Sequence, residues 1–221
     1  TRKESSAASD VYKRQAQQSY NFIEDYEISF MIVFIVLVTL LILYIVYENH
    51  TRNKELLKYA QTDALTGLYN KETTEQLTDE LLSEDENKYH AFLILDVDCF
   101  KQINDIYGHA VGDIVLQKFG KLLKGTFREG DILGRIGGDE FGVIMKNIQT
   151  KDIAMKKAEE LLAKTQAYKI DELKGNNISI SIGISTAPQD GDCYMDLYKR
   201  ADQALYQAKR SGKARVCNYF S

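Results

Sequence analysis

Four acidic residues in two short blocks are the side chains of this sequence best suited to chemistry. An apolar run ends in Asp96 and Asp98, which alternation places on the same face of a predicted strand. Asp139 and Glu140 follow two glycines, which permit the positive φ angles of a tight hairpin. An ionised carboxylate beside a buried strand is costly unless it is hydrogen-bonded, paired or bound to a metal. On neighbouring strands the two blocks would form an acidic metal site that activates a hydroxyl and neutralises phosphate charge.

Each acidic block also has a simpler interpretation. Asp98 can cap the helix that follows it, which we favour for that residue, so Asp96 is the better ligand candidate. A Gly-Gly-Asp-Glu turn on its own is usually only a polar hairpin tip. Because the tip projects Asp139 and Glu140 onto opposite faces, one of them can meet Asp96.

The elements that must position these residues alternate between strands and helices from residue 63 onward. Strand-like runs occupy 91–97, 132–136, 141–145 and 178–184, with a weaker one at 215–219. Helical patterns occupy 71–83, 113–127, 152–168 and 194–210. A short Gly-Gly-led turn joins the second and third strands, so these form a hairpin and the sheet is mixed. The predicted fold class is α/β (α+β), with a ferredoxin-like or palm-like arrangement.

Composition limits the range of functions. The 221 residues suffice for one domain and an appendage, and 27% charged beside 44% apolar residues is typical of a globular protein. A formal charge of −4 excludes nucleic acid held by charge alone and favours a small anionic ligand bound by a few local cations. The cysteines and histidines are too scattered to predict a disulfide framework or a zinc site.

An apolar segment near the N-terminus predicts a membrane anchor. Met31 to Tyr47 contains one polar residue, Thr39, and extension to Ile28 gives a transmembrane helix over 28–47. A signal-peptide core would be shorter, and a buried core helix is rarely apolar on every face. Basic residues follow this segment and acidic residues precede it, which favours a cytoplasmic C-terminal side and a location in the inner membrane.

The segments on either side of the span are less informative. Residues 1–27 carry no functional prediction, because the chain begins with Thr and 5–15 resembles the translation of a sequencing adaptor. The charged stretch 48–61 either continues the membrane helix as a short coiled linker or is a solvated connector with no coupling role.

Several spaced blocks resemble the GGDEF domain of diguanylate cyclases. Besides Gly137–Phe141 (GGDEF), they are Asp63–Asn70 (DALTGLYN), Asp96–Asp105 (DVDCFKQIND), Gly108–Asp113 (GHAVGD) and Ala201–Lys209 (ADQALYQAK). Their order and spacing are far more specific than the pentapeptide alone. The resemblance covers about residues 60–220 and implies a GGDEF domain over 62–221.

The resemblance implies a set of functional residues. Asp96, the backbone carbonyl of Val97, and Asp139 match the ligands of Mg²⁺, for which Mn²⁺ can substitute, and Glu140 matches an acid with a metal-binding or proton-accepting role. The residues that match the family's substrate-binding positions are Lys101, Asn104, His109, Asp113, Lys209 and Lys213.

Asn104 and Asp113 match the positions that read guanine. An amide and a carboxylate suit the donors and acceptor of the guanine edge, and Asp113 can equally be the N-cap of its helix. The three lysines match the phosphate contacts, although isolated lysines are normally solvated surface groups. If the last helix persists, Lys209 and Lys213 share one face. The family usually has Arg at position 213, and Lys lacks its bidentate fork.

The resemblance also implies an activity and its inhibition. Two GTP molecules would condense into cyclic di-GMP and two pyrophosphates, in a homodimer because one site holds half of the reactants. Arg128 and Asp131 match the RxxD site at which cyclic di-GMP inhibits the family, although an exposed ion pair within a turn is the usual explanation of this motif. The alternative function is a catalytically inactive GGDEF domain that acts as a receptor for GTP or cyclic di-GMP.

Overall fold

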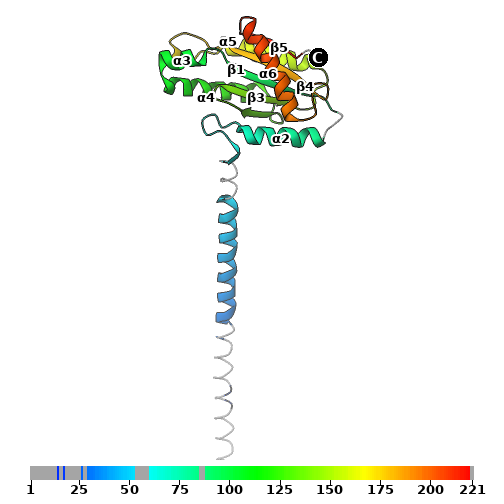
Figure 1. Cartoon of the computed structure of the whole chain (residues 1–221). Helices are drawn as coiled ribbons and strands as arrows, with labels where there is room; N and C mark the ends of the chain where they lie inside the picture. Colours follow the sequence, from blue (N-terminus) through cyan, green and yellow to red (C-terminus); the bar gives the residue numbers. More distant parts are fainter. Residues whose placement is uncertain are drawn as a thin grey trace, which may run out of the picture. The chain divides into compact units, whose positions relative to one another are not determined.

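The computed structural model describes residues 29–52, 60–84 and 88–219, together with Arg14, Gln17 and Tyr26. The chain forms two compact units, Thr1–Leu57 and Lys58–Ser221. The first contains the helix Ser29–Arg52, which is long and apolar enough to cross a membrane and whose large apolar side chains are exposed (Figure 1). Of the predicted linker, 48–52 and 60–61 are helical, and 53–59 lie outside the described residues, as does nearly all of 1–27.

A five-stranded sheet with the order β2-β3-β1-β4-β5 forms the centre of the second unit. Its strands are β1 (His90–Val97), β2 (Ile132–Arg135), β3 (Glu140–Met145), β4 (Ile180–Ala187) and β5 (Val216–Asn218). The first four pair antiparallel, whereas β4 and β5 pair parallel. The predicted mixed sheet and its β2–β3 hairpin are therefore confirmed, with strand ends that differ by up to three residues.

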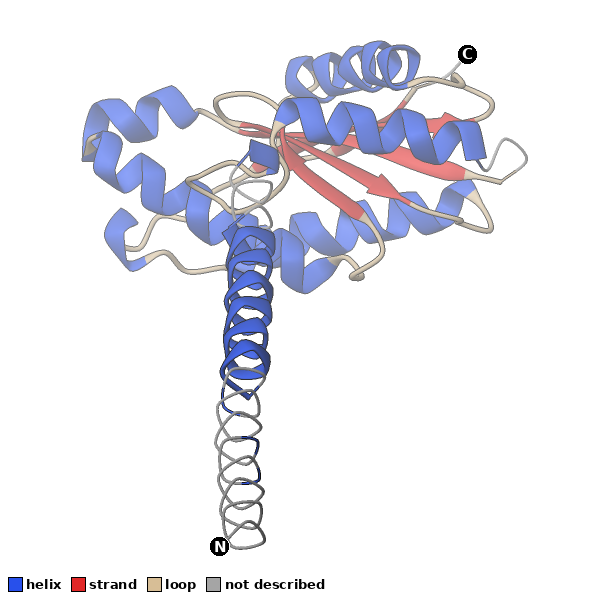
Figure 2. Cartoon of the chain, turned by 90° about the horizontal axis from the view of Figure 1, so that it is seen from below, coloured by secondary structure: helices blue, strands red, loops and turns tan. Residues whose placement is uncertain are grey.

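Helices cover both faces of this sheet (Figure 2). They are α2 (Lys71–Glu84), α3 (Phe100–Tyr107), α4 (His109–Thr126), α5 (Lys151–Ala167) and α6 (Tyr194–Arg210), with a 3-10 turn η1 (Asp171–Leu173). Leu93 and Leu95 of β1 belong to the core beneath α4 and α5, whereas Phe92 and Ile94 belong to the core beneath α2 and α6. Because side chains alternate along a strand, Asp96 emerges on the α6 side.

A glycine on β4 sets how closely α6 approaches the sheet. A Cβ atom at Gly183 would overlap the carbonyl oxygen of Ala201 and the backbone nitrogen of Leu205. Contact of this kind between two backbones requires glycine. The close packing fixes the position of the C-terminal end of α6, where Lys209 lies.

Two helical predictions need correction. Helix α3 was not predicted, and α4 begins at His109 after Gly108, whose φ of 86° separates the two helices. Asp113 therefore lies within the second turn of α4, and its prediction as an N-cap is wrong. Helix α6 ends at Arg210, so Lys209 and Lys213 do not share a helical face.

Candidate functional site

Asp96 lies next to the end of β1 and is buried. Its carboxylate accepts an ion-pair contact from Lys209 Nζ on α6 at 2.7 Å. Burial raises the pKa of Asp96 above its ordinary value, the Lys209 ammonium opposes this shift, and the negative charges of Asp139 and Glu140 add to it. Asp96 pairs with Glu140 across β1 and β3, and Asp139 directly precedes Glu140, so the three acidic residues lie together at this end of the sheet.

The turn between β2 and β3 brings the second acidic block to Asp96. The N–H groups of Ile136 and Gly137 donate to the Glu140 carbonyl at 3.0 and 3.2 Å, which closes the hairpin. Glu140 is the cross-strand partner of Asp96. The Val97 N–H donates to the Asp139 carbonyl at 3.3 Å, so the end of β1 lies against the turn.

This cluster fits a hard divalent cation by the chemistry of its donors. Of the three carboxylates, Asp96 contacts the Lys209 ammonium, and Asp139 and Glu140 are only partly buried. Mg²⁺ prefers oxygen ligands and usually keeps several waters, which a partly open acidic site permits. Burial, and to a smaller degree the neighbouring carboxylates, raise the pKa of Asp96, and a bound cation would favour its ionised form.

Asp98 has a different role from its neighbour. Its carboxylate accepts hydrogen bonds from Ser179 Oγ and Ser181 Oγ, each at 2.7 Å, and from the Ala214 N–H at 3.1 Å. The residue that caps α3 is Cys99, with a φ of 58°. The prediction that Asp98 caps this helix is therefore wrong, because the buried carboxylate instead connects β1, β4 and the loop before β5.

The three predicted phosphate-binding lysines occupy different settings. Lys209 contacts Asp96, and Lys101 is exposed on α3. Lys213 lies in the loop after α6 with a φ of 60°, and its Nζ donates to Cys99 Sγ at 3.2 Å. The Cys99 contact raises the pKa of Lys213, and the charges of Asp98 and Asp96 add to the shift, so this ammonium also lies near the acidic cluster.

The residues that the sequence predicts to bind the base lie on helices α3 and α4. Asn104 lies over Gly112, where a Cβ atom would overlap its Oδ1. This Oδ1 atom is buried and has no hydrogen-bond partner among the described residues. Asp113 and His109 are exposed on α4. A buried acceptor of this kind is normally satisfied, and a ligand that donates N–H groups would satisfy it.

Arg128 and Asp131 lie at the opposite end of β2 from the acidic cluster. Arg128 Nε contacts Asp131 Oδ1 at 3.1 Å, and the guanidinium also donates to the Lys146 carbonyl. A pocket of about 500 Å³ adjoins them, lined in part by Ile148 and Ile153. The intra-turn ion pair is thus present, and it lies beside a space that can hold a ligand.

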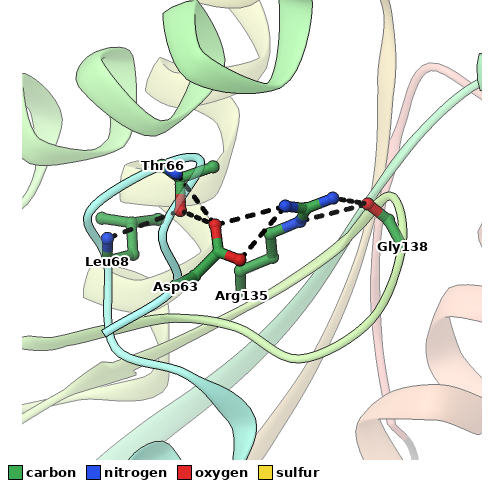
Figure 3. Close-up of polar contacts among 5 residues, drawn as sticks. All are labelled: Asp63, Thr66, Leu68, Arg135 and Gly138. Atoms are coloured by element: carbon green, nitrogen blue, oxygen red, sulfur yellow. Dashed lines mark hydrogen bonds and ion pairs between the residues drawn. The ribbon is translucent and has the colours of Figure 1, made fainter. Parts of the chain in front are cut away.

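Sequence reasoning missed a polar cluster behind the Gly137–Phe141 turn. Arg135 contacts both carboxylate oxygens of Asp63 and donates to the Gly138 carbonyl (Figure 3). Asp63 belongs to the DALTGLYN block, and Arg135 lies outside every block of the resemblance. The available signal was an arginine two residues before the glycine pair, in a strand that is otherwise apolar or glycine.

The chain is similar to known proteins over this domain. The family model described as "Diguanylate cyclase, GGDEF domain" matches residues 60–215. Diguanylate cyclase A of Treponema denticola is 37% identical over 170 residues, which cover 74% of this chain and 46% of that protein. The response regulator PleD of Caulobacter vibrioides is 37% identical over 177 residues, which cover 77% and 39%. The chain thus spans about half the length, or less, of these relatives.

Solved structures agree with these similarities. The coiled coil and GGDEF domain of DgcB from Caulobacter crescentus, in complex with c-di-GMP, matches with a TM-score of 0.72 and 26% identity, over 78% of this chain and 93% of that chain. The GGDEF domain of TpbB from Pseudomonas aeruginosa matches with a TM-score of 0.68 and 33% identity, over 72% and 94%.

The sheet has the order β2-β3-β1-β4-β5, and carboxylates of the adjacent strands β1 and β3 meet at the turn before β3. This arrangement defines a palm-like α/β domain. The chain belongs to the GGDEF domain family of diguanylate cyclases.

Proposed function

We propose that this protein is a diguanylate cyclase that condenses two GTP molecules into cyclic di-GMP. The observation that supports the proposal is the acidic cluster of Asp96, Asp139 and Glu140, in which Asp96 contacts Lys209 and pairs with Glu140 across the strands. Membership of the GGDEF family and the names of its relatives support the same activity.

Asp96, Asp139 and the backbone carbonyl of Val97 would hold Mg²⁺, and Mn²⁺ could replace it. Bound there, the cation would neutralise phosphate charge and favour ionisation of the attacking hydroxyl. Glu140 would either add a ligand or accept the proton of that hydroxyl, and its position opposite Asp96 is compatible with both.

The substrate would be oriented by residues on both sides of this cluster. Lys101, Lys209 and Lys213 would contact the phosphates, and the unsatisfied Oδ1 of Asn104 would accept an N–H of guanine. Asp113 and His109, exposed on the adjoining helix α4, would complete the base and ribose contacts.

The reaction would require two copies of the domain. The 3′-hydroxyl of each GTP attacks the α-phosphate of the other, so each attack forms one phosphorus–oxygen bond and releases one pyrophosphate. One domain supplies half of the reactants, and a homodimer that holds both nucleotides in line would supply much of the rate by orientation.

Two further assignments accompany the activity. Cyclic di-GMP would bind at Arg128 and Asp131, beside the pocket that adjoins them, and inhibit turnover. The helix Ser29–Arg52 would anchor the protein in the inner membrane, with the GGDEF domain in the cytoplasm.

The second candidate function is a catalytically inactive GGDEF domain that acts as a receptor for GTP or cyclic di-GMP. The observation that favours it is Lys213, which replaces the usual Arg and whose ammonium contacts the Cys99 thiol. The three carboxylates argue for catalysis, because a receptor has no need of a complete acidic cluster.

Turnover of GTP by the purified protein in detergent decides between these functions. The full chain is incubated with GTP and Mg²⁺, and cyclic di-GMP is measured by mass spectrometry beside an Asp139→Ala variant. Product that is absent from the variant supports the cyclase. A folded, dimeric protein that binds GTP without forming product would favour the receptor.

A further inference from the structure

Arg135 connects the start of the GGDEF domain to the Gly137–Phe141 turn. This arginine is the last residue of β2, and its NH1 group contacts both oxygens of Asp63 at 3.2 Å. Its Nε and NH2 groups donate to the carbonyl of Gly138 at 3.2 and 2.7 Å. One planar side chain thus binds two partners that lie 75 positions apart in the sequence, as Figure 3 shows.

The Asp63 side of this connection is firmly held. Asp63 Oδ1 also accepts from the Thr66 N–H and the Thr66 hydroxyl at 2.8 and 2.7 Å. Burial alone would raise the pKa of Asp63, but the hydrogen bonds from Thr66 and Arg135 outweigh it, so this pKa lies below its ordinary value. The carboxylate is therefore a fixed negative partner for the guanidinium at neutral pH.

Backbone contacts attach the same segment to β2. The Tyr69 N–H donates to the Leu133 carbonyl at 3.0 Å, and the Arg135 N–H donates to the Tyr69 carbonyl at 2.8 Å. The backbone of Arg135 and its side chain are thus both bound to the segment that begins the domain. The Arg135 and Asp63 side chains are only 16% and 23% exposed, which strengthens their attraction relative to a pair in water.

The hydrogen bonds from Arg135 to the Gly138 carbonyl hold the peptide group between Gly138 and Asp139, next to the candidate metal site. The carbonyl of Gly138 and the N–H of Asp139 belong to the same planar peptide group, so fixing one fixes the other. A Cβ at Gly138 would meet no atom of the described residues within 4 Å, and Gly138 has no side chain to hold the turn. The Asp139 carbonyl has a longer contact, 3.3 Å, to the Val97 N–H.

We infer that Arg135 is a positioning residue, which holds the Gly138–Asp139 peptide so that the Asp139 carboxylate faces Asp96, and that Asp63 holds Arg135 in turn. The inference rests on the proposed function, because it concerns the orientation of a proposed metal ligand. The described helical residues Ala60 and Gln61 lie just before Asp63. A displacement of these first residues of the domain would therefore move Asp63 and, through the Arg135 side chain, the peptide at the proposed metal site.

Three variants of the full chain test the inference: Arg135→Ala, Arg135→Lys and Asp63→Asn. The matched control is Lys164→Ala on α5, which removes an exposed ion pair at a site remote in the fold. Loss of groups that orient metal ligands typically costs ~10- to 100-fold in metal affinity or activity. Arg135→Ala should lower kcat and raise the Mg²⁺ concentration for half-maximal activity within this range, with a smaller change in KM for GTP.

The conservative variants separate orientation from stability. Asp63→Asn keeps the Arg135–Gly138 contact and should lose less than Arg135→Ala. Arg135→Lys keeps the charge without the fork, and should be intermediate. Methylguanidine added to Arg135→Ala should restore part of kcat, which a purely structural loss would not permit. If Arg135→Ala fails to fold, the Mg²⁺ dependence of Arg135→Lys decides.

Binding of Mn²⁺ in the presence of GTP, measured by electron paramagnetic resonance, separates this inference from the proposed activity. Absence of cyclic di-GMP from the wild-type protein would overturn the activity alone, while weaker Mn²⁺ binding in Arg135→Ala or Arg135→Lys would still support the positioning role. Mn²⁺ affinity and kcat equal to those of the Lys164→Ala control would overturn the inference.

Discussion

At the scale of single residues, Asp96 and Asp63 differ in the groups that surround their carboxylates. Asp96 is buried and repelled by two other carboxylates, so its pKa is raised, whereas Asp63 is held by donors, so its pKa is lowered. Two aspartates of one domain are thus shifted in opposite directions. The first arrangement favours the arrival of a cation, and the second stabilises the fold around the turn.

Asp63→Asn should show the stabilising contribution directly. A carboxylate whose pKa is depressed by folding stabilises the native state above its unfolded pKa, near 3.8, and this stability is lost as the pH falls through the lower folded pKa. We expect the variant to lose about 1 kcal/mol of unfolding free energy at pH 7. Urea denaturation from pH 7 down to the acid limit should show the difference shrink below pH 4. A difference independent of pH would contradict this explanation.

Lys213→Arg should test the departure from the family at the phosphate site. Arg restores the bidentate fork, so KM for GTP should fall by ~3- to 10-fold, the effect of one stronger charge-assisted contact. Steady-state kinetics of the two proteins at saturating Mg²⁺ measure this. Cys99→Ala serves as the control for loss of the thiol contact. An unchanged KM would mean that position 213 does not contact phosphate.

At the scale of elements, the strands were predicted well because their apolar runs are long and the glycine pair marks the hairpin. The sequence did not indicate α3, because it has only eight residues and follows Cys99 in a left-handed conformation. The predicted start of α4, Asp113, is four residues late because Gly112 in the first turn interrupts the helical pattern. The contacts of Asp98, Arg135 and Lys213 are with residues that lie far away in the sequence. Hydrophobic periodicity carries no information about such contacts.

Gly183→Ala should separate α6 from the sheet. The added methyl group would meet the backbone of α6 at Ala201 and Leu205, so relief requires movement of the whole helix rather than a side-chain rotation. Overpacking of this kind typically costs about 1 to 3 kcal/mol. Thermal and urea denaturation measure the loss. Gly125→Ala, at a helical position with open space around the added carbon, is the control and should not destabilise the domain.

At the scale of the whole molecule, the proposed reaction makes activity a property of two chains. The mixed sheet and the family membership are properties of one chain. In the proposed reaction each site would hold half of the reactants, so it would be complete only in a dimer. The candidate membrane helix would confine two copies to one plane and raise their effective concentration.

Dilution should therefore change the turnover of the unit Lys58–Ser221 but not that of the full chain in a membrane. For Lys58–Ser221, turnover per subunit should fall as the protein is diluted below its dimer dissociation constant, with the oligomeric state measured by mass photometry at each concentration. The full chain in liposomes at a fixed protein-to-lipid ratio should keep its turnover when the suspension is diluted. Constant turnover by a soluble unit shown to be monomeric would contradict the requirement for a dimer.

The backbone contacts of Tyr69 have a consequence for solubility. Strand β2 lies at the edge of the sheet, and an open edge is a template for β-association with another copy. Tyr69 binds the Leu133 carbonyl and the Arg135 N–H, so part of this edge is already paired within the chain. A second copy of the domain therefore finds fewer free backbone groups on β2, whereas the proposed dimer would join two domains through their nucleotides.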